Sequence, residues 1–169
     1  MMRRAVLLLI VVLALPSLAF ASAQDEERKG EPYLRARIID TDPMGTNMRD
    51  APKGKILYNV PLHPKDDLER LVDVYEQRGD WFRVTNAGNG RSGWMHSSVL
   101  GLRGGAAEDG PCPLKRSPAE EAATIVTPAE GAVLQLLGFT DARDGVWFMV
   151  RYTDARGKKY EGWLPQQCE

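Results

Sequence analysis

The stretch Trp81-Phe82-Arg83-Val84, followed by Gly93-Trp94, recurs later in the chain as Trp147-Phe148-Met149-Val150, followed by Gly162-Trp163. Within residues 81–85, side chains of different character alternate with the two-residue period of a sheet. An Asn-Gly pair in residues 86–90 predicts a hairpin turn between this strand and the next. The pattern therefore predicts two copies of one small β unit.

The spacing of prolines supports this repeat. Pro52 precedes Trp81 by 81 − 52 = 29 residues, and Pro118 precedes Trp147 by 147 − 118 = 29 residues. Self-similarity at a fixed interval is typical of repeated structural units. No catalytic group recurs with the aromatic and glycine positions, so the repeat favours a binding or scaffolding protein over an enzyme.

Further strands are expected on both sides of these motifs. Residues 67–78 fit a helix or a strand, and we favour a strand from Leu71 onward; residues 97–100 predict a single helical turn. The strands expected in the first copy are 34–40, 56–60, 81–85 and 92–96, and those in the second copy are 114–116, 124–126, 132–139, 146–152 and 159–164.

The start of the chain has the layout of a secretory signal. Two arginines precede an apolar run over residues 5–15, and Ala21-Ser22-Ala23 supplies small residues for cleavage. A membrane anchor is the alternative, but Pro16 interrupts the run before the roughly 20 apolar residues of a spanning helix. We expect a signal peptide at 1–23 and export without stable membrane insertion, to the periplasm in the first place, with full secretion left open.

Charge and length limit the function classes. Removal of residues 1–23 takes the formal net charge from −1 to −1 − 2 = −3, with acids and bases interspersed. This balance gives no basic patch for nucleic acid. Residues 24–169 suffice for one ordinary domain or two small ones. We expect a flexible lead-in at 24–33, a first domain at 34–103, a linker at 104–111 and a second domain at 112–169.

The two cysteines, Cys112 and Cys168, bracket the second copy. Export would place them where a disulfide persists, so we expect them to pair. A metal site and a reactive thiol are the alternatives. His63 and His96 lie in the first half without the short ligand spacing of a zinc finger, so no metal and no cofactor is expected.

The motifs of the first copy resemble the bacterial SH3-like domain family of exported and cell-wall-associated proteins. Thr46-Asn47-Met48-Arg49-Asp50-Ala51-Pro52 is similar to the family's Leu-Asn-Val-Arg-x-x-Pro opening, and residues 79–84 and 93–95 follow in order. In the second copy, Leu114-Lys115-Arg116-Ser117-Pro118 lacks the Asn of this opening. The resemblance implies an all-β protein with two tandem SH3-like barrels of five strands each.

The family commonly recognises cell-wall peptides or pairs with other exported domains. The resemblance therefore implies a non-enzymatic binding module whose partner is a peptidoglycan peptide or a peptide segment of an envelope protein. The alternative is a structural or assembly factor in which two barrels form one rigid unit without a small ligand. Candidate ligand-binding residues are Asn47, Arg49, Tyr58, Tyr75, Trp81, Trp94 and Trp163.

Each candidate has a structural alternative. Trp81 could serve as a core aromatic, and Asn47 and Arg49 lie in a loop where turn stabilisation is the simpler role. An envelope hydrolase is a third possibility, resting on His96 with Ser97 or Ser98. Adjacent strand residues point to opposite faces, so we expect this pair to be unable to cooperate as base and nucleophile.

Overall fold

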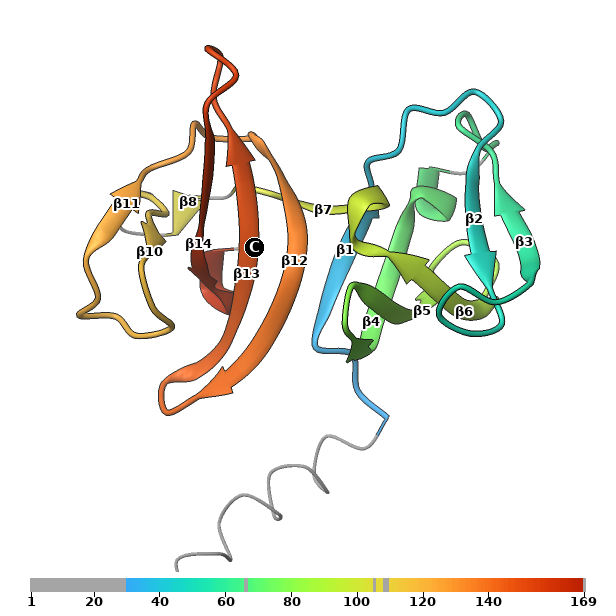
Figure 1. Ribbon diagram of the computed structural model, residues 1–169, viewed down its shortest axis with the longest axis horizontal. Helices are drawn as coiled ribbons and strands as arrows, with labels where there is room; N and C mark the ends of the chain where they lie inside the picture. The colour runs from blue at the N-terminus through green and yellow to red at the C-terminus, as the bar shows by residue number, and fades with distance from the viewer. Residues whose placement is uncertain (1–29, 66, 105, 108–109, 169) are drawn as a thin grey trace, which may run out of the picture. The chain divides into compact units, whose positions relative to one another are not determined.

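Runs of alternating apolar and polar residues form antiparallel strands in the computed structural model of the chain (Figure 1). The structure describes residues 30–65, 67–104, 106–107 and 110–168. The expected signal peptide and most of the lead-in lie outside these residues. The described strands belong to one compact unit, Pro32–Glu169. The expected all-β class is confirmed.

The first half contains six strands and two 3-10 turns. These are β1 (Leu34–Ile38), β2 (Thr46–Arg49), β3 (Ile56–Val60), η1 (Asp67–Arg70), β4 (Leu71–Arg78), β5 (Trp81–Asn86), β6 (Ser92–His96) and η2 (Ser97–Val99). The strand expected from Leu71 onward and the helical turn after β6 are both present. The ambiguous segment before Leu71 is the short turn η1.

The second half contains eight strands and one 3-10 turn among the described residues. Its elements are β7 (Leu100–Arg103), β8 (Ala106–Ala107), β9 (Gly110–Pro111), β10 (Leu114–Lys115), β11 (Thr124–Val126), β12 (Val133–Ala142), β13 (Gly145–Thr153), β14 (Lys159–Pro165) and η3 (Gln166–Cys168). β8 and β9 pair only with each other among the described residues, whereas the other strands share one sheet.

The repeat read from the sequence is also present in the strand order. The sheet runs β3-β2-β6-β5-β4 at one end and β11-β10-β14-β13-β12 at the other. The register agrees as well, because Arg49 pairs with Trp94 and Lys115 pairs with Trp163. A register shift falls at Met48/Arg49 in one copy and at the corresponding Leu114/Lys115 in the other. The two halves therefore share one folding pattern.

Strand β7 belongs to both copies, and the sequence did not predict it. Gly101 of β7 pairs with Arg37 of β1, while Leu102 pairs with Leu134 of β12. A side chain at Gly101 would not fit, since a Cβ there would lie 2.8 Å from the Leu134 carbonyl oxygen. The two copies are consequently joined in one sheet that is not closed, rather than separated into two barrels.

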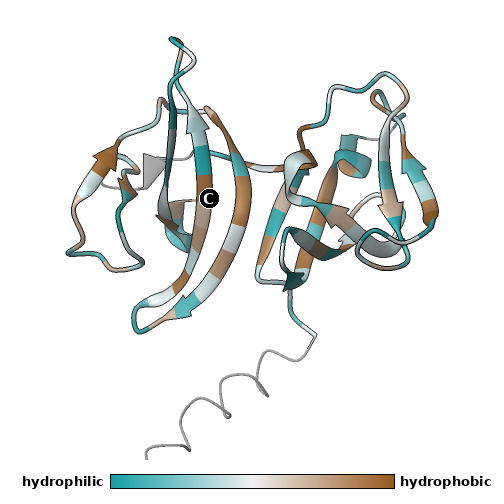
Figure 2. Cartoon of the chain, viewed as in Figure 1, coloured by the Kyte–Doolittle hydropathy of each residue, from teal (hydrophilic) through white to brown (hydrophobic). Residues whose placement is uncertain are grey.

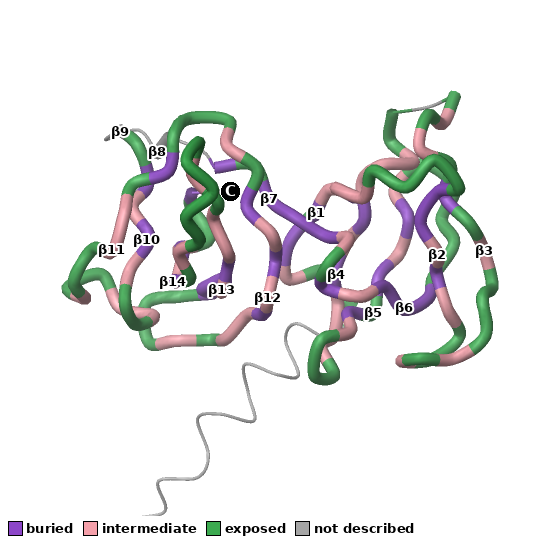
Figure 3. Tube along the Cα trace, turned by 45° about the horizontal axis from the view of Figure 1, so that its top comes forward, coloured by how far each residue is buried: buried purple, intermediate pink, exposed green. Residues whose placement is uncertain are grey.

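On several strands, buried apolar residues alternate with more exposed ones along the chain (Figures 2 and 3). On β1, Leu34, Ala36 and Ile38 are buried, whereas Arg35 between them is exposed. On β12, Leu134 and Leu136 are buried in the same alternating way. This period of two is the one expected for β1 from the sequence, and it gives the sheet its apolar core.

Gln77 of β4 ties the two copies together. Its amide nitrogen donates to the Leu137 carbonyl at 3.2 Å, and its amide oxygen accepts from the Phe139 backbone N–H at 3.2 Å. Both bonds are made next to the register shift that β12 has at Gly138. A Cβ on Gly138 would come within 3.1 Å of the Gln77 amide. The side chain thus satisfies backbone groups that the shifted ladder leaves unpaired.

Replacing Gln77 with Leu should lower the free energy of unfolding by about 1–3 kcal/mol, because it leaves a partly buried backbone donor and acceptor without partners. Urea denaturation followed by tryptophan fluorescence measures the loss. Gln167→Leu is the control, since Gln167 is exposed on η3. An equal effect of both substitutions would show that the Gln77 bonds do not stabilise the junction.

Candidate functional site

One cavity of the first copy brings polar and aromatic side chains together. It has a volume of about 180 Å³. The loop between β1 and β2 forms one wall, and residues of β2, β5, β6 and η2 form the rest. Its lining residues are Asp40, Asp42, Gly45, Thr46, Asn47, Arg49, Trp81, His96 and Val99. Three of the expected binding residues, Asn47, Arg49 and Trp81, therefore meet at one site.

The aromatic wall is held by neighbouring strands. Trp81 of β5 and His96 of β6 are directly paired in the sheet, and their rings meet edge to face with centroids 5.2 Å apart. The Arg49 guanidinium carbon lies 6.0 Å from the centre of the Trp81 ring. Arg49 also donates from Nη1 to the Gly54 carbonyl oxygen at 2.7 Å. This bond fixes the guanidinium beside the indole and leaves its other N–H groups available.

The opposite wall is a loop stabilised by its own side chains. The Thr46 hydroxyl donates to Asp40 Oδ2 at 2.9 Å, and the Met44 backbone N–H donates to Asp42 Oδ1 at 2.8 Å. These bonds are typical of Asp in tight turns. The loop therefore places two carboxylates across the cavity from Arg49. The sequence indicated a turn here, but gave no sign that Asp40 and Asp42 would face the Trp81 site.

His96 and Ser98 lie closer than expected. His96 Nδ1 accepts the Ser98 backbone N–H at 3.2 Å and lies 2.9 Å from the Ser98 hydroxyl oxygen. The expectation that His96 cannot reach a serine is therefore wrong for Ser98, because η2 turns the chain back after β6. Acceptance at Nδ1 assigns the proton of the neutral ring to Nε2. Among the described residues, no carboxylate bonds to this imidazole, so the orienting third group of a triad is missing.

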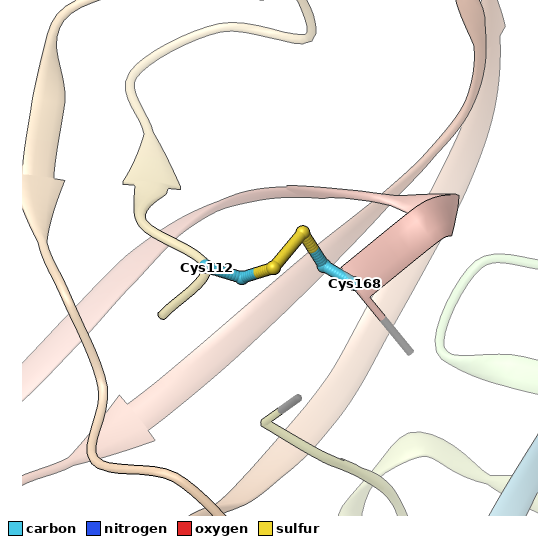
Figure 4. Close-up of a disulfide and its surroundings, with 2 residues drawn as sticks. All are labelled: Cys112 and Cys168. Carbon is cyan, nitrogen blue, oxygen red and sulfur yellow. A yellow bond between two sulfur atoms is a disulfide. The ribbon is translucent and has the colours of Figure 1, made fainter. Parts of the chain in front are cut away.

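In the second copy, a disulfide joins the positions that correspond to two cavity-lining residues of the first copy. Leu114 corresponds to Met48 in register, so Cys112, two residues earlier, corresponds to Thr46. Cys168 ends η3 as Val99 ends η2. The expected bond between Cys112 and Cys168 is present (Figure 4), and both cysteines are buried. A covalent bond therefore links two positions whose counterparts in the first copy, Thr46 and Val99, line the cavity.

The second copy also lacks the polar aromatic wall. Trp147 pairs with Pro165 where Trp81 pairs with His96. The Trp147 side chain is 1% exposed. Its indole N–H donates to Asp144 Oδ1 at 2.9 Å, and this bond holds the pKa of the Asp144 carboxyl below its usual value. The same motif residue is a core tryptophan in one copy and a cavity residue in the other.

The other two candidate tryptophans do not line the cavity. Trp94 is 7% exposed, and the Arg78 guanidinium covers its ring at 4.9 Å. Trp163 is half-buried and occupies the same register position in the second copy. The glycines before them have packed backbones, since a Cβ at Gly93 would lie 2.8 Å from the Arg49 carbonyl oxygen. The conserved spacing of Gly and Trp within the two copies thus reflects packing.

Tyr58 lies in a separate polar cluster. Its hydroxyl donates to Glu69 Oε2 at 3.0 Å and accepts from the Asn89 amide at 3.2 Å. Burial raises the pKa of Tyr58, and the neighbouring Glu69 carboxylate raises it further. The Arg91 guanidinium covers the ring at 4.2 Å. These contacts stabilise the turn of the β5–β6 hairpin against η1 and β3.

Tyr75 lines a different hollow of about 400 Å³, together with Tyr33, Glu76, Gln77, Gly79 and Phe139. Tyr33 and Phe139 stack there with centroids 4.3 Å apart. The structure thus distributes the seven candidates over several places instead of one surface. Of the seven, Asn47 and Arg49 of β2 and Trp81 of β5 line the same cavity. The sequence had placed Asn47 and Arg49 in a loop, whereas both lie on a strand.

The described residues contain neither a group suited to a metal ion nor a membrane-spanning helix. No group of three or more His, Cys, Asp or Glu residues in the described part of the chain is arranged to hold a metal ion. In the same residues, no helix has both the length and the apolar character needed to cross a membrane. Comparison with protein-family models and with curated proteins finds no match for this chain.

Proposed function

We propose that the chain is an exported, non-enzymatic protein of the cell envelope that binds peptides through the first of two SH3-like repeats. The observation that carries this proposal is the difference between equivalent places in the two copies. In the first, Thr46 and Val99 line a cavity beside Trp81, whereas in the second the corresponding positions are the buried, disulfide-bonded Cys112 and Cys168. The first copy then serves as the ligand-binding repeat, and the second stabilises it.

Two further observations support the SH3-like and exported character. The strand order and the register shifts recur in both copies, as expected of tandem modules. A buried disulfide is compatible with an oxidising compartment outside the cytoplasm. Strand β7 pairs with a strand of each copy, so the two repeats behave as one unit and not as independent modules.

The cavity suits a short peptide that carries both signs of charge. Arg49 retains N–H donors for a carboxylate or carbonyl oxygen, and the His96 Nε2–H is a second donor. Asp42 is exposed on the opposite wall, where it can pair with an amine. The half-buried Trp81 ring supplies flat contact area between them. Stem peptides of the cell wall combine amines and carboxylates in this way, so they are the proposed ligands.

The test compares matched positions of the two copies. Binding of soluble muropeptides, measured by isothermal titration calorimetry, should be weakened about tenfold or more by Arg49→Gln, because a charge-assisted hydrogen bond is lost. Lys115→Gln, the register equivalent in the second copy, should leave affinity unchanged. Circular dichroism of both variants checks that each is folded.

Three results would contradict the proposal. These are no binding of muropeptides or sacculi by the folded protein, equal loss of affinity in both variants, and hydrolysis of the muropeptide. Hydrolysis abolished by His96→Ala would instead identify the His96–Ser98 pair as catalytic.

A structural role is the second candidate, and the junction between the copies favours it. β7 is paired on both sides, and Gln77 bonds across to β12. Such a unit is suited to holding two surfaces of another exported protein at a fixed distance. Co-purification of one stable partner from envelope extracts, together with absent muropeptide binding, would select this function.

A further inference from the structure

A third cavity lies where β1 meets β7. It has a volume of about 200 Å³ and is lined by Arg35, Arg37, Leu71, Gly101, Leu102 and Arg103. Three arginines therefore line a space that is too small for a drug-sized ligand, for which about 300 Å³ or more is usual. The space suits the charged head of a larger molecule.

One of the three arginines at this cavity has a carboxylate partner among the described side chains, and two do not. Arg35 forms an ion pair with Asp73 of β4, with Nε and Oδ1 2.8 Å apart. The side chains of Arg37 and Arg103 have no hydrogen bond or ion pair with any other residue that the structure describes. The formal net charge of the whole chain is −1, so this concentration of positive charge does not follow from a basic composition.

The pairing of the strands explains why these arginines meet. Arg37 stands opposite Gly101 on β7, and Arg103 stands two residues further along β7 on the same face. At Gly101 itself, the Ile39 side chain and the Leu134 carbonyl oxygen each lie 2.8 Å from the position that a Cβ would take, so neighbouring atoms are packed against this residue. The sequence placed the arginines of β1 on one face, but it could not show that β7 brings a third one beside them.

A nearby half-buried arginine, Arg70, adds to the local excess of positive charge. Arg70 donates from Nη2 to the carbonyl oxygens of Ile38 and Asp40, at 2.7 and 2.9 Å. Burial lowers the pKa of its guanidinium; the Asp40 charge opposes this change, while the Arg37 charge adds to it. Arg37 thus repels a neighbouring cation, and an anion bound beside it would relieve this repulsion.

We propose that Arg37 and Arg103 form a binding site for a phosphate group, with Arg35 at its rim. Guanidinium groups match the geometry of phosphate oxygens and form paired hydrogen bonds with them. Two cations without carboxylate partners correspond to the double charge of a phosphate, whereas a single carboxylate would neutralise only one. The site shares no lining residue with the cavity beside Trp81, so it does not depend on the proposed peptide site.

Titration with inorganic phosphate at constant ionic strength tests the site on residues 24–169, which contain the whole compact unit. The variant Arg37→Gln/Arg103→Gln should bind phosphate about tenfold or more weakly than the wild type. The control Arg143→Gln/Arg156→Gln removes the same charge from exposed positions at two hairpin turns and should bind normally. Acetate should bind much more weakly than phosphate, and Trp81→Ala should retain phosphate binding.

Vesicles distinguish a lipid headgroup from free phosphate. Sedimentation with phosphatidylglycerol vesicles but not with phosphatidylcholine vesicles, lost only in the Arg37/Arg103 variant, would support the site and identify a lipid phosphate as its source. Phosphate binding without vesicle binding would support it with a soluble phosphate as the source. The proposal is overturned if neither probe binds, if acetate binds as well as phosphate, or if the control variant loses binding equally.

Discussion

Replacing Trp147 with Ala should lower the free energy of unfolding by about 3–5 kcal/mol, the range typical of a large aromatic side chain removed from a core. Trp147 is 1% exposed, and its neighbour Phe148 is fully buried. The substitution leaves a cavity and also removes the indole N–H that bonds to Asp144. Urea denaturation followed by circular dichroism measures the change.

The equivalent substitution in the first copy should affect binding more than stability. Trp81 is half-buried and borders the open cavity, so Trp81→Ala removes fewer packed contacts and should cost about 1–2 kcal/mol. Muropeptide binding should disappear in this variant, because the flat contact surface is lost. The two substitutions thus separate the supporting copy from the binding copy at the same motif position.

Trp147→Phe serves as the control for packing. It keeps an aromatic ring in the core but cannot donate to Asp144, so its loss of stability should be clearly smaller than that of Trp147→Ala. Equal destabilisation by Trp81→Ala and Trp147→Ala would contradict the division of roles between the copies. If Trp81→Ala lost muropeptide binding only because the protein unfolds, this would also contradict the division of roles between the copies.

Much of the fold could be predicted because its periodic signals are local. β3 and β6 have the predicted bounds, and the hairpin of β5 and β6 follows from the Asn-Gly turn between alternating residues. The pairing of Cys112 with Cys168 followed from their positions around the second copy. In each case, the prediction needed only adjacent residues or the spacing of residues within one repeat.

The failures concern long-range pairing. β7 contains Gly101 and is followed by Gly104, and the sequence predicted no strand there; its strand conformation depends on β1 and β12, which lie far away in sequence. The candidate cavity could be predicted only in part for the same reason. Trp81 and Arg49 were recognisable from their motifs, but the motif alone does not distinguish the half-buried Trp81, which pairs with His96, from the buried Trp147, which pairs with Pro165.

Removing the disulfide should be the second large effect on stability. The bond joins residues separated by 56 positions, and closure of such a loop in the unfolded chain corresponds to about 4 kcal/mol of lost chain entropy. The double substitution Cys112→Ser/Cys168→Ser should therefore lower the free energy of unfolding by about this amount. Both cysteines are also buried, so the sulfur atoms contribute packing in the core of the second copy.

Comparison with the reduced wild type separates these two contributions. Reduction removes the cross-link but keeps both sulfur atoms, whereas the double serine variant removes both and introduces two buried hydroxyl groups. If chain entropy dominates, the reduced protein should lose nearly as much stability as the variant. A reduced protein as stable as the oxidised one would show that the cross-link is not what stabilises the second copy. In that case, its support of the binding copy would have to come from the shared strand β7 and from Gln77.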